Sequence, residues 1–220
     1  MSPNEGFLVK SIPEPLRNLQ AAMFEPPSDT HTTERRFGWM GRTKPEPKPL
    51  PSWLITVNTQ HGGIDAVIAS IQTYLEAGKP VYHPPVGNYP QKLDFFLVGE
   101  WLIDTFDGVP CQLLHLQDIV AIVGNTQFRT QLILKDGTTH SLLFSKLQWR
   151  HIFELFQSLN PSILAPETLL TLPNGTKVEI YEAVIHAFEC SDNGDMTLRH
   201  PETLQTILDL HTQRTTLTTP

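Results

Sequence analysis

The sequence predicts an α+β fold in which an antiparallel β-barrel or sheet is capped by the helix that follows it. Short β-branched and aromatic runs crowd residues 93–143, as is typical of strands. Asp136 and Gly137 separate two alternating runs in TQLILKDGTTHSLLFS, and an Asp-Gly pair in this setting strongly indicates a hairpin. The amphipathic stretch SKLQWRHIFELFQSLNP comes directly afterwards and stops at Pro161.

A strand, a helix and a second strand are expected ahead of this core, over residues 53–92. The run WLITV at 53–57 is short, apolar and β-branched, which predicts a buried strand. Apolar residues then recur at helical spacing, and Gly78 and Pro80 signal the end of that helix. They are Ile64, Val67, Ile68, Ile71 and Leu75. VYH at 81–83 predicts a further short strand.

Within the core, residues 93–164, the pattern predicts successive strands and one helix. LDFFLVGEWLIDTF offers two apolar runs around Gly99, and CQLLHLQDIVAIVG predicts one strand or a pair. Ser145 is the expected N-cap of the helix that follows. Its apolar stripe comprises Leu147, His151 or Ile152, Leu155, Phe156 and Leu159.

A hairpin and a helix are expected as an extension over residues 165–214. Asn174 and Gly175 lie between alternating runs, which predicts the hairpin turn. YEAVIHAFE has strand-like alternation, and HPETLQTILDLHTQR has a helical stripe. We favour an added hairpin and helix over an internal repeat of the core hairpin, followed by a disordered tail at 215–220.

The order GEWLIDTF, LHLQDIVAIVG, QLILKDGTTHSLLF and a helix ending in LNPSIL resembles bacterial pleckstrin-homology-like (PH-like) domains. The resemblance covers residues 93–164 and implies a curved antiparallel sheet followed by a helix. It also implies binding to protein segments, other subunits or lipid headgroups rather than catalysis. Lipid-binding members use a basic cluster, whereas the basic residues of this segment are scattered, which argues against lipid headgroups. Examples are Lys92, at its edge, and Arg129, Lys135 and Lys146.

Composition narrows the classes of partner. The 220 residues carry a net charge of −7, and residues 51–220, with nine basic and seventeen acidic residues, carry −8. An acidic body repels phosphate backbones, so nucleic acid is not expected as a partner. Cys111 and Cys190 are too few for a disulfide framework. No apolar run is long enough to cross a membrane and no signal peptide is evident, so a cytoplasmic protein is expected.

Residues 1–52 are expected to form a proline-rich, largely extended arm. Leu16, Leu19 and Met23 could line one face of a short helix, and alternating prolines at 45–51 favour an extended spacer. The motif RRFGWMGR places aromatic residues among arginines, a composition common at interfaces. It either docks onto a partner or folds back over its own body. The candidate partner-binding residues are Arg35, Arg36, Phe37, Trp39, Met40 and Arg42.

The stretch VNTQHGGID raises the question of an active-site loop. His61, Gly62 and Gly63 lie between an apolar run and a helix N-terminus, an arrangement that can hold an anion on backbone N–H groups. The stretch lacks the Lys and Ser/Thr of a P-loop, and it has neither GxGxxG nor GxSxG. The alternative is an ordinary turn with His61 at the surface.

No catalytic constellation, metal site or cofactor motif is expected. On a helix His186 and Cys190 would share a face, but the alternation around them favours a strand. Glu100, Asp104 and Asp107 are the tightest acidic group and are typical of strand ends.

The leading hypothesis for function is a non-enzymatic protein–protein interaction module with a docking arm. The first alternative is a structural subunit whose arm binds a neighbouring copy of the chain. The second is a small-molecule enzyme that uses the Gly62-Gly63 loop, with His61 and a nearby carboxylate. An enzyme predicts a deep polar pocket beside the glycines, and a docking module predicts an exposed groove or sheet edge.

Overall fold

The computed structural model describes residues 12–17, 19, 50–83, 93–106, 109–124, 129–143, 149–190 and 196–218. Helices and small antiparallel sheets alternate through these ranges, so the chain is α+β, as predicted. In the part of the chain that the structure describes, none of the helices is long and apolar enough to span a membrane.

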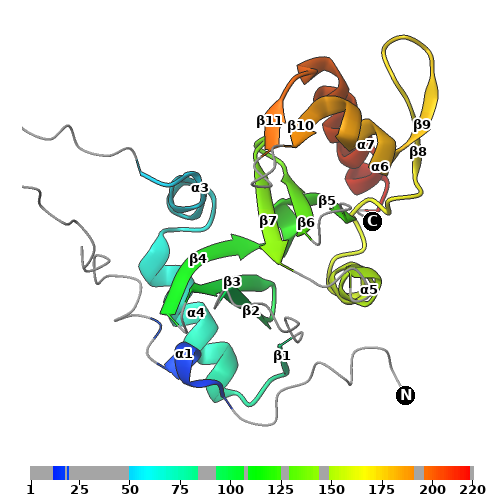
Figure 1. The fold of residues 1–220 in the computed structure, drawn as a ribbon. Coiled ribbons are helices and arrows are strands. Elements are labelled where there is room, and N and C mark those ends of the chain that lie inside the picture. The colour runs from blue at the N-terminus through cyan, green and yellow to red at the C-terminus, as the bar shows by residue number, and fades with distance from the viewer. Residues whose placement is uncertain are drawn as a thin grey trace, which may run out of the picture.

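The first sheet has the strand order β1-β2-β3-β4, all antiparallel. Its strands are β1 (Val81–Tyr82), β2 (Leu93–Val98), β3 (Trp101–Phe106) and β4 (Val109–His115). The helices α1 (Glu14–Arg17), α3 (Ser52–Gln60) and α4 (Ile64–Glu76) pack against one face of it (Figure 1). Alternate residues of β2 face opposite ways: Phe96 and Val98 face these helices, and Phe95 and Leu97 face the second sheet.

The second sheet has the order β5-β6-β7 and begins directly after the 3-10 turn η2 (Leu116–Asp118). Its strands are β5 (Ile119–Gly124), β6 (Arg129–Leu134) and β7 (Thr139–Leu143). The helix α5 (Trp149–Leu159) follows and closes the core between the two sheets, with Ile152, Leu155 and Phe156 fully buried. Asn160, which follows α5, donates from its amide to the Leu116 carbonyl at 2.7 Å and so anchors η2.

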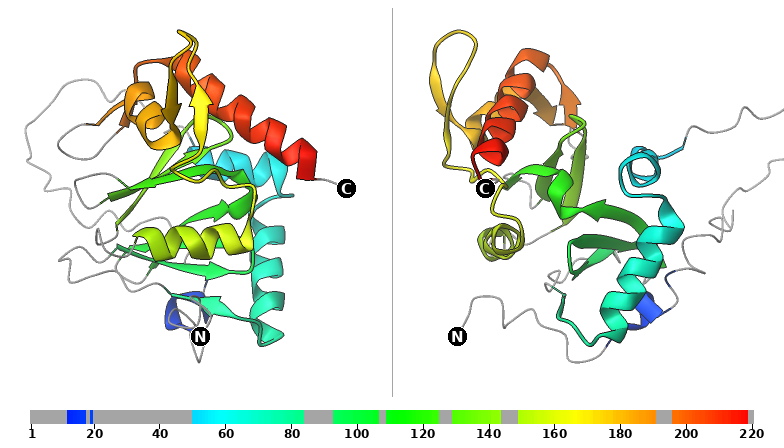
Figure 2. Two further views of the ribbon diagram at one scale, coloured as in Figure 1. Left: turned by 90° about the vertical axis from the view of Figure 1, so that its right-hand side faces the viewer. Right: turned by 180° about the vertical axis from the view of Figure 1, so that it is seen from behind.

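The C-terminal unit covers the other face of β5 and β6, at the opposite end of the molecule from α4 (Figure 2). It consists of β8 (Leu169–Thr171), β9 (Lys177–Glu179), α6 (Ile180–Ala187), β10 (Phe188–Cys190), β11 (Met196–Leu198) and α7 (Pro201–Thr218). Val120, Ala121 and Val123 of β5 face this unit, whereas Ile119 and Ile122 face the core beneath α5. Strand β5 is therefore buried on both faces.

Most of the predicted elements are confirmed. The helix at 64–76, the strand at 81–82, both hairpins and the helix after Pro201 lie where the sequence places them. CQLLHLQDIVAIVG forms a pair of strands, β4 and β5, joined by η2. Leu16 and Leu19 are buried, as a short helix requires. Ser145, Met23 and Asp107 lie outside the described residues.

The strand predicted over 53–57 is wrong, because the run WLITV lies in the helix α3. Only Val57 of this helix is buried, and Ile55 is about half exposed. Trp53 and Val57, four residues apart, face the core together. The β-branched residues therefore fit the helix with one narrow buried stripe, and tertiary packing overrides their strand preference.

The strand predicted within YEAVIHAFE is also wrong for its first part, because residues 180–187 form α6. Its buried residues Ile180, Ala183, Val184 and Ala187 have helical spacing, and a capping box between Glu179 and Glu182 starts the helix. The tail predicted from residue 215 is partly wrong, since α7 continues to Thr218.

A closed barrel was one of the two predicted arrangements, and the described strands do not form one. The two sheets are separate, with β4 paired only to β3 and β7 paired only to β6 among the described residues. The polypeptide therefore leaves a seam between β4 and the hairpin β6–β7.

Candidate functional site

The HGG loop is a tight turn between two helices. Helix α3 ends at Gln60, and the N–H groups of His61 and Gly63 both donate to the Val57 carbonyl at 3.1 Å. Gly62 and Gly63 have φ values of 78° and 95°, which side-chain-bearing residues rarely adopt, so both glycines suit the reversal into α4. The turn directs the His61 side chain inward.

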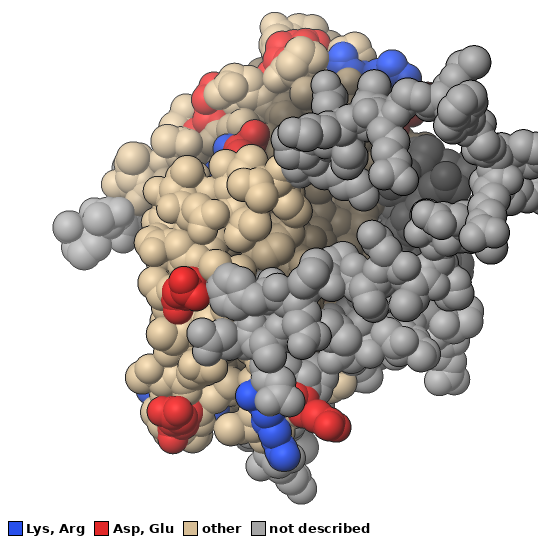
Figure 3. All heavy atoms as spheres, turned by 90° about the vertical axis from the view of Figure 1, so that its left-hand side faces the viewer, with Lys and Arg blue, Asp and Glu red and all other residues tan. Residues whose placement is uncertain are grey.

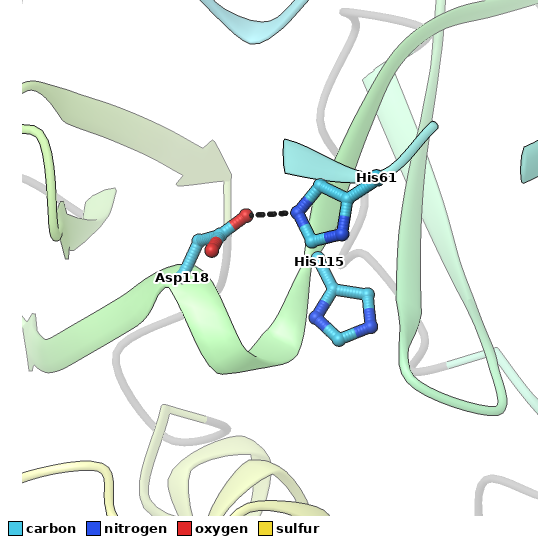
Figure 4. A group of neighbouring side chains, drawn as sticks. All are labelled: His61, His115 and Asp118. Carbon is cyan, nitrogen blue, oxygen red and sulfur yellow. Dashed lines mark hydrogen bonds and ion pairs between the residues drawn. The ribbon is translucent and has the colours of Figure 1, made fainter. Parts of the chain in front are cut away.

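His61 meets two residues from the η2 region. Its Nε2 lies 2.8 Å from Oδ2 of Asp118, and its ring lies 4.6 Å from the ring of His115 at an angle of 29° (Figure 4). Trp101 packs edge-on against both imidazoles. His61, His115 and Asp118 each offer one possible metal-ligand atom, and these three atoms all lie within 4.8 Å of one another.

His115 is held in a defined orientation. Its Nδ1 accepts the backbone N–H of Gln117 at 3.2 Å, and its Nε2 lies 3.4 Å from Oε2 of Glu100. Burial, followed by the nearby charge of His61, lowers the pKa of His115 below its usual value, while Glu100 and Asp118 act in the opposite direction. The hydrogen bond to Nδ1 assigns the ring proton of the neutral imidazole to Nε2.

A second histidine–aspartate pair lies nearby and joins the two sheets. Nε2 of His140 on β7 is 2.5 Å from Oδ2 of Asp104 on β3. Oδ1 of the same carboxylate is buried and has no hydrogen-bond partner among the described residues. Cys111 lies beside this pair, and burial together with Asp104 raises the pKa of its thiol to about 11. The thiol is therefore protonated at neutral pH and is a poor nucleophile.

A small pocket lies in the seam, between α3, the end of β4 and the β6–β7 turn. Trp53 and Thr56 line it from α3, and Gln112 and His115 line it from β4. Asp118, Asp136, Thr138 and His140 lie around the rest of its wall. Its interior of about 40 Å³ has room for a few water molecules.

The charged side chains on the surface are scattered, as their positions in the sequence indicate. Figure 3 shows acidic and basic side chains dispersed over the described part of one face, without a basic cluster.

Two of the C-terminal histidines, His186 and His200, lie against each other. The His186 and His200 rings stack 4.3 Å apart, and His186 Nδ1 lies 3.0 Å from the Thr203 hydroxyl. Cys190 is exposed on β10. His211 on α7 is buried, which lowers its pKa to about 4, and its Nε2 has no hydrogen-bond partner among the described residues.

The structure brings one predicted site residue into a cluster. His61 joins His115 and Asp118, two residues that the sequence reasoning did not single out. Gly62 and Gly63 serve the turn, and the anion-binding role of the loop remains a prediction. The motif Arg35–Arg42 lies outside the described residues. The three-residue interval between His115 and Asp118 at a strand end was the signal available for the missed pair.

Comparisons with protein-family models, with curated proteins and with solved structures found no match to this chain.

Proposed function

We propose that this chain is a non-enzymatic protein–protein interaction module with a PH-like arrangement. In support, an antiparallel sheet of four strands is followed by one of three strands and then by the helix α5, which packs on the core between them. The resemblance implies a curved antiparallel sheet followed by a helix, and here the antiparallel strands form two sheets before the helix. A fold alone does not identify a ligand. The seam between β4 and the hairpin β6–β7 is the surface that we assign to binding.

The open seam is the observation that carries the proposal. Among the described residues, β4 and β7 each have one edge without a strand partner, and the pocket lies between β4 and the β6–β7 turn. Unpaired strand edges bind extended segments through main-chain hydrogen bonds. Trp53 lines the same pocket and is only partly buried, so it offers an apolar surface beside these edges.

We propose an extended, basic and aromatic segment of a protein partner as the occupant. The body has a net charge of −8, and Asp118 and Asp136 lie at the pocket. The chain's own Arg35–Arg42 has the matching composition, and a neighbouring copy would supply it in trans. If a neighbouring copy supplies the segment, the protein is both a docking module and a subunit of an assembly.

The test uses the full chain with Phe37→Ser and Trp39→Ser, so that its own motif does not compete. A fluorescein-labelled peptide of residues 32–45 is titrated with this protein and followed by fluorescence anisotropy. We expect saturable binding with a Kd of roughly 100 µM or tighter, the range of modest peptide recognition. A peptide with the same charges but serine at both aromatic positions should bind at least about tenfold more weakly, because the aromatic anchors are lost.

Two matched threonines locate the binding surface. Thr56 lines the pocket, Thr73 lies on α4 away from it, and each hydroxyl donates to the carbonyl four residues earlier in its helix. In the same protein, Thr56→Arg should weaken peptide binding at least about tenfold by blocking the seam and repelling arginine. Thr73→Arg should leave it unchanged. Absence of saturable binding, or equal effects of the two arginines, would contradict the proposal.

The enzyme alternative has one observation in its favour, the His61–Asp118 pair. A histidine–carboxylate pair can act as a general base when a nucleophile lies within hydrogen-bond reach. The pocket hydroxyls of Thr56 and Thr138 donate instead to the Ser52 carbonyl and to the Asp136 carboxylate. This arrangement favours the non-enzymatic proposal.

A further inference from the structure

We propose that His61, His115 and Asp118 form a binding site for one Zn²⁺ ion. This site is distinct in chemistry from the proposed docking function and does not depend on it. Two imidazoles and one carboxylate are a donor set that zinc accepts, with a water molecule completing the tetrahedron. Mg²⁺ and Ca²⁺ prefer oxygen donors and should bind poorly.

The three ligands come from segments that the fold holds firmly. His61 follows the last residue of α3, where its own N–H is bonded to Val57. His115 ends β4, in register with Trp101 of β3. Asp118 ends η2, where its carbonyl accepts the Lys135 N–H at 2.9 Å. The three ligands are therefore brought together by ordered backbone segments and not by flexible surface side chains.

The polar groups around the three ligands suit a metal site. His115 Nε2 faces the Glu100 carboxylate, so a metal at Nδ1 would complete the carboxylate–histidine–metal arrangement found around many zinc ions. A metal at Nδ1 would take the place of the Gln117 N–H as partner of that nitrogen. The partly buried position, against Trp101, limits competition from water.

The required rearrangement is small for His61 and Asp118. Zinc bonds of about 2.0–2.1 Å place two tetrahedral ligand atoms about 3.3 Å apart. The His61 Nε2 and Asp118 Oδ2 atoms lie 2.8 Å apart, so they would separate by about half an ångström as zinc takes the place of the shared proton.

Other histidine groups in the described residues provide internal controls. The His140–Asp104 pair has the same two residue types as His61 and Asp118. Among the described residues, however, this pair is not part of a group of three possible ligands. The stacked His186–His200 pair lies on the C-terminal unit, with His200 bonded to Glu202. If histidine content alone drew zinc, these pairs would bind it as well.

The experiment is a calorimetric titration of the full, tag-free chain with Zn²⁺ at neutral pH, repeated with Co²⁺, whose visible absorption reports nitrogen and oxygen ligation in a tetrahedral site. We expect one ion per chain with a micromolar or tighter Kd and no binding of Mg²⁺. His61→Ala and Asp118→Asn should each weaken binding at least about tenfold, within the range seen for lost interactions in metal sites. His140→Ala and His200→Ala should leave binding unchanged.

Circular dichroism confirms that each variant is folded, and Asp118→Asn keeps the shape of the site if His61→Ala unfolds the chain. Loss of the cobalt absorption in Asp118→Asn with unchanged secondary structure supports the site. Absence of stoichiometric Zn²⁺ binding in the natural chain overturns it. So does binding that survives both His61→Ala and Asp118→Asn, since the ion must then lie elsewhere.

Discussion

Gly99, in the turn between β2 and β3, has two independent reasons to be glycine. Its φ of 62° lies in the left-handed region, and a Cβ added there would meet the ring of Tyr74 at 3.0 Å. Gly78, after α4, has a nearly equal φ of 65°, but an added Cβ would meet nothing within 4 Å. A comparison of alanine substitutions at Gly78 and Gly99 therefore distinguishes the cost of backbone strain from the cost of a steric contact.

We expect Gly78→Ala to lower the free energy of unfolding by about 1–2 kcal/mol, the cost of a left-handed alanine. Gly99→Ala should cost about 1–3 kcal/mol more, because the Tyr74 ring must also move. Urea unfolding followed by circular dichroism measures both changes. Equal losses in the two variants would show that Tyr74 moves aside freely.

At the scale of elements, the N-terminal helix α1 belongs to the body and not to a free arm. Leu16 and Leu19 are among the most completely buried side chains, and they pack in the cluster that α4 and β3 share. Residues 20–49 are thus bounded on both sides by segments packed on the first sheet. The predicted arm of residues 1–52 is therefore attached to the body at Leu16 and Leu19.

Leu19→Ala should lower the free energy of unfolding by about 2–5 kcal/mol through the cavity it leaves. Glu14→Ala, at an exposed position of the same segment, should change it by less than about 0.5 kcal/mol. Thermal unfolding of the full chain compares them. A Leu19→Ala protein as stable as Glu14→Ala would place the segment outside the cooperative core.

Element types could be predicted where periodicity and turn chemistry agree, as in α4, α7 and the hairpin at Asp136-Gly137. Element types could not be predicted where the residue composition favours one type of element and the pattern of burial in the folded chain fits another. WLITV is rich in strand-forming residues, but in the folded chain it buries only a narrow stripe as α3. In α6 the three- and four-residue spacing of Ile180, Ala183 and Val184 was hidden by the strand-like alternation of YEAVIHAFE.

At the scale of the whole molecule, three hydrophobic clusters are joined through shared strands. Strand β2 sends alternate residues to the cluster beneath α4 and to the one beneath α5, and β5 does the same between α5 and the C-terminal unit. A strand buried on both faces transmits the loss of one cluster to the next. We therefore regard the described body as one cooperative unit.

Ile71→Ala in α4 and Ile207→Ala in α7 test this cooperativity, because each removes a fully buried side chain from a different cluster. Each substitution should lower the midpoint of one calorimetric transition by an amount equivalent to about 2–5 kcal/mol. The double variant should show the sum within about 0.5 kcal/mol, since the sites share no cluster. Two resolved transitions, each sensitive to one substitution, would indicate separate folding units.

The candidate metal site shows why a site is harder to predict than an element. His61 attracted attention because of its glycines, but His115 and Asp118 lie more than fifty residues away in the sequence. Their approach depends on how α3 crosses the end of β4, a tertiary arrangement that local spacing does not encode. The seam could not be predicted from the sequence either, because it depends on which strand edges remain unpaired in the folded chain.

The two-sided burial of β5 also has a consequence for synthesis on the ribosome. When residues 119–124 leave the exit tunnel, the side chains that will cover one of their faces, on α6 and α7, have not been made. A nascent chain halted before residue 180 would thus display Val120, Ala121 and Val123 to solvent. Chaperones bind exposed apolar segments of this kind, so we expect the emerging chain to need protection until its later helices have been made.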